Sequence, residues 1–157
     1  MPSELLCSQW IESYLRIRGI EYFRGQRDSD YFFIAKAVCG ALHVHLAEAA
    51  YGRSMSVQVT VPRFFPAADR RRLMRLARRW NRRGGLIKVV LYRSVDPTRI
   101  GVVAEGFVPV GCGVGFEEFT VAVDASIAGG AEFFGEVAAL LEVAHGHSRQ
   151  AWLPDAS

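Results

Sequence analysis

Two kinds of hydrophobic periodicity alternate along this chain and divide it into helices and strands. Apolar side chains recur three or four residues apart over residues 4–18, from Pro66 to Arg83, and from Phe116 to about Ala144. This is the spacing of helices with one buried face. The third segment keeps its helical phase across Gly129-Gly130, although glycine weakens helices. The pattern therefore predicts three helices, the last of them long.

Between the helical segments, apolar and polar residues alternate in steps of two, as in strands that bury one face. Turns are expected at Cys39-Gly40 and at Asp96-Pro97, and Gly84-Gly85 is expected to stop the second helix. The order is α-βββ-α-ββ-α, and its short connections favour an antiparallel sheet with helices packed on it, an α+β fold. The expected strands are Tyr31–Val38, Leu42–Leu46, Met55–Val61, Leu86–Arg93 and Arg99–Val108.

Composition limits the class of protein. The chain has 157 residues, half of them hydrophobic, which suits a single domain with one core over residues 4–144 and a frayed tail at 145–157. No apolar run reaches the ~20 residues that a membrane-spanning helix needs. The first residues lack the pattern of a secretory signal, and the cysteines are three and scattered, so we expect a cytoplasmic protein without disulfides.

Four segments have a recognisable order along the chain. They are Val57–Pro62 before the second helix, Arg78–Arg82 at its end, Lys88–Tyr92 in the next strand, and Phe133-Phe134 in the last helix. Together they resemble the YbjN family. The pair Trp80-Asn81, which closes a helix and leads into a strand that contains a lysine, is the most specific of these. The resemblance implies a fold similar to type III secretion chaperones and a bacterial, cytoplasmic, non-enzymatic regulator that often forms homodimers. It implies no catalytic residues.

Candidate sites for cofactors and metals are weak. The loop Gly111–Gly115 lies where a phosphate-binding loop could lie, between a strand and a helix, but its spacing fits neither the dinucleotide fingerprint nor the P-loop. His43 and His45 share one face of a strand, and two more histidines lie in the tail, yet no acidic or thiol ligand stands at a fixed spacing to complete a metal site. Cys112 has no adjacent base. We therefore expect no catalysis, no cofactor and no metal.

The strongest feature is the charge of the second helix. Eight of its fourteen positions from 70 to 83 are arginine, whereas no Lys or Arg occurs between Ile100 and Ser148, a segment that carries seven acidic residues. The arginines lie opposite an apolar stripe, so the helix is half core and half cationic. Either this face is simply solvated or it binds anions. The candidate partner-binding residues are Arg71, Arg75, Arg78, Arg79 and Arg82.

The sequence thus predicts a protein-binding, chaperone-like or regulatory adaptor that holds an acidic or amphipathic protein segment. The alternative is a nucleic-acid-binding regulator that uses the same arginines. The net charge of only +3, the acidic last helix and the lack of aromatic residues among the arginines make nucleic acid the less favoured partner. The segregated charges could also pair two copies of the chain into a homodimer.

Overall fold

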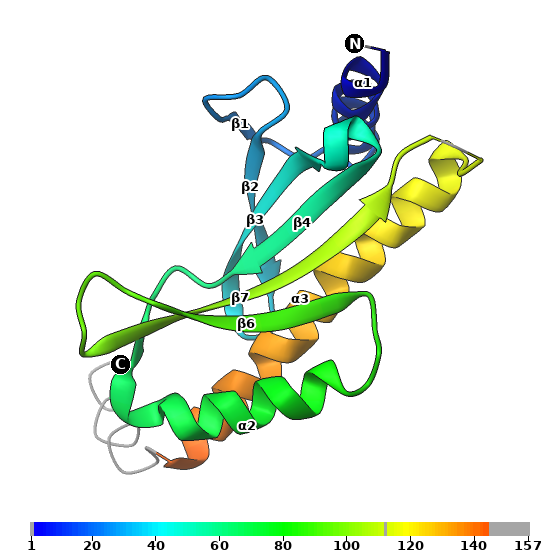
Figure 1. The fold of residues 1–157 in the computed structure, drawn as a ribbon. Coiled ribbons are helices and arrows are strands. Elements are labelled where there is room, and N and C mark those ends of the chain that lie inside the picture. The colour runs from blue at the N-terminus through cyan, green and yellow to red at the C-terminus, as the bar shows by residue number, and fades with distance from the viewer. Residues whose placement is uncertain (1, 112, 145–157) are drawn as a thin grey trace.

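An antiparallel sheet with helices on one side forms the body of the protein (Figure 1), in a computed structural model that describes residues 2–111 and 113–144. The tail predicted to be frayed, residues 145–157, lies outside the described residues. The helices are α1 (Pro2–Ile17), α2 (Arg70–Asn81) and α3 (Phe116–Ala144). The strands are β1 (Phe23–Arg24), β2 (Tyr31–Ala37), β3 (Gly40–Ala49), β4 (Ser54–Thr60), β5 (Phe65–Pro66), β6 (Ile87–Arg93) and β7 (Arg99–Pro109).

The strands follow the order β1-β2-β3-β4-β7 across the sheet, and every pair is antiparallel. Strand β6 pairs with the free side of β7, while the two-residue β5 pairs with β7 beyond the end of β4. The α+β fold with an antiparallel sheet, predicted from the alternation of the two periodicities, is confirmed. Among the described residues, no helix is both long and apolar enough to cross a membrane.

The core lies between one face of the sheet and the helices. Leu46, Val57 and Ala104 come from neighbouring strands and point to the same side, because the register pairs Leu46 with Val57 and puts Ala104 opposite Val59. Helix α3 passes behind the sheet in Figure 1, and α2 lies below β6. Fully buried aromatic side chains of α3 contact the other two helices: the Phe119 ring meets Trp10 of α1, and the Phe133 ring meets Trp80 of α2.

The structure corrects three details of the predicted elements. Strands β1 and β5 were not expected, since two residues carry no periodicity. The second helix begins at Arg70 and not at Pro66, because Phe65 and Pro66 pair with β7 and a 3-10 turn, Ala67–Asp69, follows them. The turn between β2 and β3 is Val38-Cys39, and Gly40 opens β3 with φ of +116°.

Candidate partner-binding surfaces

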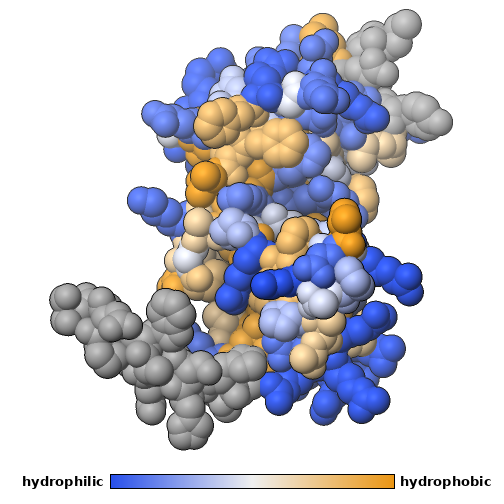
Figure 2. All heavy atoms as spheres, turned by 90° about the vertical axis from the view of Figure 1, so that its left-hand side faces the viewer, coloured by the Kyte–Doolittle hydropathy of each residue, from blue (hydrophilic) through white to orange (hydrophobic). Residues whose placement is uncertain are grey.

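Helix α2 is amphipathic, and its two sides have different surroundings. Its apolar residues Leu73, Leu76, Ala77 and Trp80 are buried, and the Trp80 ring meets Phe133 of α3 edge-on at 5.6 Å between centroids. Burial of large apolar side chains, about 1.5–3 kcal/mol each, holds the helix in place. Trp80 therefore packs on the core. All eight arginines of the segment 70–83 are exposed, and Figure 2 shows a dense hydrophilic group where α2 lies, at the lower right.

Only some of these arginines have an acidic neighbour. Arg72 lies 3.9 Å from Asp69 at the start of the helix. Arg83 contacts two carboxylates of α3, Glu132 at 3.6 Å and Glu136 at 3.3 Å. These contacts involve three acidic residues, one just before α2 and two on α3. Within the described part of the chain, no ion pair involves any of the five predicted partner-binding residues: Arg71, Arg75, Arg78, Arg79 and Arg82.

The unpaired arginines form a stripe. Arg71, Arg75, Arg78 and Arg82 follow one another at steps of four, three and four, which is the spacing of one helix face. The eleven steps from Arg71 to the cap residue Arg82 span about 16 Å at the rise of an α-helix. Like charges at this spacing repel one another by a few tenths of a kcal/mol per pair. The stripe is therefore a surface whose electrostatic energy falls when an anionic partner binds.

The C-terminal end of α2 is fixed to the outer side of β6 by Asn81. Its side-chain Nδ2 donates to the Val89 carbonyl at 2.9 Å, and its Oδ1 accepts from the Val89 N–H at 2.8 Å. Lys88 Nζ donates to the Asn81 carbonyl at 3.0 Å. Asn81 thus supplies the hydrogen bonds that a further strand would give to Val89. The two residues of the Trp80-Asn81 pair thus have distinct structural roles. Trp80 packs on the core, and Asn81 hydrogen-bonds the outer edge of β6 at Val89.

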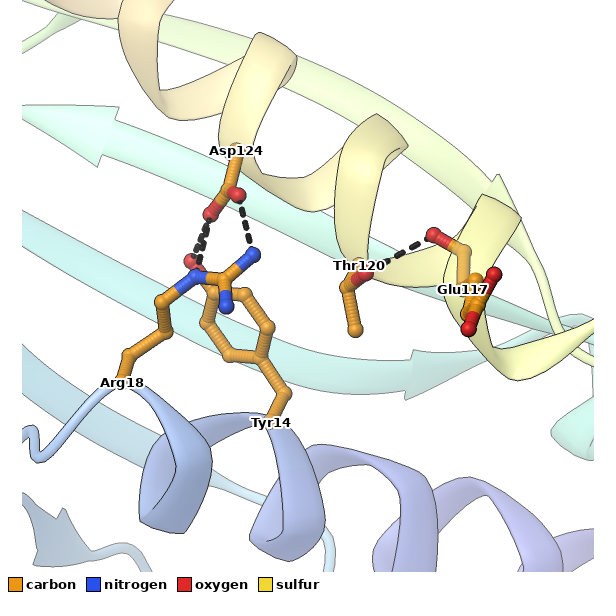
Figure 3. Close-up of polar contacts among 5 residues, drawn as sticks. All are labelled: Tyr14, Arg18, Glu117, Thr120 and Asp124. Atoms are coloured by element: carbon orange, nitrogen blue, oxygen red, sulfur yellow. Dashed lines mark hydrogen bonds and ion pairs between the residues drawn. The ribbon is translucent and has the colours of Figure 1, made fainter.

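The acidic residues of α3 are largely engaged within the molecule, which the sequence did not predict. Asp124 accepts a hydrogen bond from the Tyr14 hydroxyl at 2.6 Å and one from Arg18 Nη2 at 2.6 Å (Figure 3). Burial alone would raise the pKa of Asp124, but the hydrogen bonds from Arg18 and Tyr14 outweigh it and lower the pKa. Burial and the bond to Asp124 raise the pKa of Tyr14. These contacts tie α1 to α3.

A second cluster of the same type ties α1 to the first two strands. The Tyr31 hydroxyl donates to Glu12 Oε1 at 2.8 Å, and Arg24 lies 3.1 Å from the same carboxylate oxygen. The Arg24 guanidinium also sits over the Tyr31 ring at 4.7 Å. Burial, and then the bond to Glu12, raise the pKa of Tyr31. Both clusters have the geometry of structural ties, because each joins elements through one shared carboxylate.

The face of the sheet opposite the helices is not covered by any described element. Across its middle runs a row of polar contacts. His45 lies between Asp30, 3.4 Å from Nε2, and Gln58, 3.3 Å from Nδ1, and Gln58 donates to Glu105 at 2.7 Å. The His45 ring also stacks on Phe32, with centroids 4.2 Å apart and planes at 6°. His45 is therefore half-buried within this row, whereas His43 on the same strand is exposed.

The other candidate residues do not come together. No three His, Cys, Asp or Glu side chains of the described part of the chain form a group that could hold a metal ion. Burial, with a smaller contribution from Glu48, raises the pKa of the Cys7 thiol to about 12, and Cys39 is half-buried. The predicted Gly111–Gly115 loop leads from β7 into α3, and Cys112 within it lies outside the described residues.

Comparison with known proteins identifies the fold. No protein-family model matches the chain, and no curated protein matches its sequence. A solved structure does match: that of YbjN, described as "a putative transcription regulator from E. coli", superposes with a TM-score of 0.65 over 85% of this chain and 92% of that chain. The identity is 13%, so the likeness is one of fold. The YbjN-type α+β fold implied by the sequence resemblance is confirmed.

Proposed function

We propose that this protein is a non-enzymatic regulatory or chaperone-like adaptor of the cytoplasm, which holds an acidic or amphipathic segment of another protein. Its binding residues are Arg71, Arg75, Arg78, Arg79 and Arg82. The observation that carries the proposal is that these five exposed guanidinium groups lie on α2 or, for Arg82, on the residue that caps its C-terminal end, and make no ion pair with a described residue. The apolar contacts of α2 and the Asn81 bonds hold that helix rigidly, so binding would not need to order it.

Guanidinium groups suit carboxylate partners in particular. Each can make two parallel hydrogen bonds to one carboxylate, and a row of them attracts an acidic segment over a distance comparable to the Debye length, about 8 Å at physiological salt. Charges of this kind raise the association rate and set the orientation, whereas affinity needs apolar contacts as well. An acidic segment with apolar residues would meet both needs.

The alternative function is a nucleic-acid-binding regulator. The description of YbjN as a transcription regulator and the same arginines favour it. A protein partner has better support, because the exposed side of α2 has no aromatic ring on which a base could stack: Trp80, the helix's own aromatic residue, is buried. The modest net charge of +3 points the same way.

The two functions can be separated with one pair of variants. The test variant replaces Arg71, Arg75 and Arg78 with Glu, and the matched control makes the same charge change at the exposed Arg16, Arg27 and Arg93. Proteins that co-purify with the wild type from the native cell extract should stay with the control and be lost from the test variant. An unchanged partner set in the test variant, or submicromolar binding of oligonucleotides at about 150 mM salt, would contradict the proposal.

A homodimer remains part of the proposal, with its charge contacts redefined. Pairing of the basic α2 with the acidic α3 of a second copy was expected, yet Asp124, Glu132 and Glu136 already contact arginines of their own chain. Glu117 and Glu118, in the first turn of α3, make no ion pair with a described residue. They are the carboxylates that a second copy's α2 would use. Light scattering of the α2 charge-reversal variant at low and high salt tests this contact, since a dimer that persists equally in both excludes it.

A further inference from the structure

The uncovered face of the sheet carries two apolar patches, one at each side. The first, which we call the edge patch, consists of Phe23, Phe32 and Ile34 on β1 and β2. Phe23 and Ile34 are 72% and 59% exposed. Figure 2, which views the molecule from the side where β1 and β2 lie in Figure 1, shows hydrophobic side chains gathered in the middle of that side with hydrophilic residues around them. Clustered exposed side chains of this size are typical of binding surfaces.

The second patch, which we call the hairpin patch, consists of Phe64, Val90 and Tyr92. Val90 and Tyr92 are two residues apart on β6, so their side chains lie on the same face of the strand. The Phe64 ring meets the Tyr92 ring edge-on, with centroids 6.2 Å apart. The Tyr92 ring covers Gly101 on the neighbouring strand so closely that a Cβ there would come within 2.2 Å of it. The ring thus lies against the sheet and presents an apolar surface outward.

Between the patches lies the polar row of the middle strands. The register links Phe32 on β2 to His45, then to Gln58, Glu105 and finally Lys88 on β6. Four steps between adjacent strands, each about 4.8 Å, separate β2 from β6, which gives about 19 Å. An α-helix covers that length in about 13 residues. A partner helix lying across the strands would therefore reach both patches with apolar side chains about 13 residues apart.

A lysine lies beside each apolar patch of this face. Lys36 follows Ile34 by two residues on the same side of β2, and Lys88 precedes Val90 by two on β6. Both lysines are exposed. The carboxylates of the face lie in the polar row between the patches, where Glu105 accepts a hydrogen bond from Gln58 and Asp30 lies 3.4 Å from His45. Each apolar patch thus has a cation beside it, which complements an acidic helix.

We propose that the uncovered sheet face is the docking site of an acidic amphipathic helix from a partner protein, which crosses the strands and buries apolar side chains on the edge patch and the hairpin patch. The proposal rests on the protein-binding function above and adds a second contact surface for the partner, on the side of the sheet opposite the helices. A helix satisfies its own backbone hydrogen bonds, so it can lie on the sheet face as α3 does on the opposite face. A second copy fits less well, because it would bring Lys36 and Lys88 of both chains together.

Site-specific cross-linking in the cell that encodes the protein tests this geometry. The photoreactive residue p-benzoylphenylalanine replaces Ile34 in one variant, Val90 in a second, and Val121 in a control, since Val121 is 65% exposed on α3, away from the sheet face. Mass spectrometry then locates the cross-linked residues. Ile34 and Val90 should label the same partner protein, at sites about 13 residues apart with Asp or Glu between them.

Three results would overturn the docking site: labelling no stronger than at Val121, labelling of a second copy or of nucleic acid, and labelling of unrelated segments from the two positions. Substitution provides a second measurement. Ile34→Glu and Val90→Glu should each reduce recovery of the partner at least about tenfold, and Val121→Glu should leave it unchanged. All three positions are exposed, so the fold should persist, which circular dichroism checks.

The docking site and the function of α2 can fail separately. If the sheet-face cross-links survive in the charge-reversed α2 variant and recovery of the partner is unchanged, the arginines have no role while the docking site stands. If the α2 variant loses the partner and the sheet face gives no cross-links, the arginines bind the partner and the docking site is wrong.

Discussion

Replacing Gly130 with alanine should destabilise the protein, although alanine favours helices. Gly130 lies in the middle of α3, facing Val59 of β4. A Cβ at this position would lie 2.8 Å from the Val59 Cβ and 2.9 Å from both of its methyl groups. Val59 is fully buried, so neither it nor the strand can move away without disturbing the core. Gly135 of the same helix is the matched control, because nothing lies within 4 Å of a Cβ there.

The two substitutions share one energetic term and differ in the other. Glycine to alanine in a helix interior gains about 1 kcal/mol of helix propensity at both sites. At Gly130, forcing an additional carbon into a filled core costs about 1–3 kcal/mol. The free energy of unfolding should thus rise by about 1 kcal/mol in Gly135→Ala, and Gly130→Ala should be about 1–3 kcal/mol less stable than that control. For a chain of this length, the midpoint temperature changes by about 2–4 °C per kcal/mol.

Urea unfolding followed by circular dichroism measures both free energies, and thermal melts provide the second readout. The midpoint of Gly135→Ala should lie above that of the wild type and the midpoint of Gly130→Ala at or below it, with equal slopes. Equal stability of Gly130→Ala and Gly135→Ala would show that α3 does not approach β4 as closely as described. The packing of the whole helix layer would then need revision.

Three further predictions concern single contacts. Asn81→Ala leaves both backbone groups of Val89 without a partner and should reduce the free energy of unfolding by about 1–3 kcal/mol in urea titrations, with Asn81→Asp restoring only the bond from the Val89 N–H. Asp124→Asn removes an exposed ion pair with Arg18 and should cost about 0.5–1 kcal/mol at neutral pH. The folded-state pKa of Asp124 is lowered, so this stabilisation is present above the unfolded pKa of about 4 and is lost as the pH falls through the folded pKa. The stabilities of the wild type and Asp124→Asn should therefore converge in acid. A stability difference that is undiminished in acid would exclude the ion pair as the source of the difference. In the native protein, Cys7 should resist iodoacetamide at pH 8 and should react only after unfolding, since its pKa is raised to about 12. Rapid labelling of Cys7 in the native protein, located by peptide mapping, would show that the thiol is accessible.

Local periodicity determined most of the elements from the sequence alone. The apolar stripe of Leu73, Leu76, Ala77 and Trp80 predicted both the helix and the side that it buries, and hence the outward position of the arginines. The long α3 was predicted through Gly129-Gly130 because its neighbours on both sides keep the helical phase. These predictions succeeded because side-chain burial repeats with the geometry of one element, and that repeat is visible in a short window.

Only the tertiary structure decided what these elements meet. Asp124 pairs with Arg18, 106 positions away, and no local pattern relates the two. In the folded protein Gly130 lies against Val59, whereas in the sequence it is recognisable only as a residue that weakens a helix. Ile34 and Val90 look like ordinary strand residues, and their exposure follows from the packing of all three helices on the other side of the sheet. The sequence determined which residues can lie on a common face; the assembly of the sheet determined which of those faces remain open to a partner.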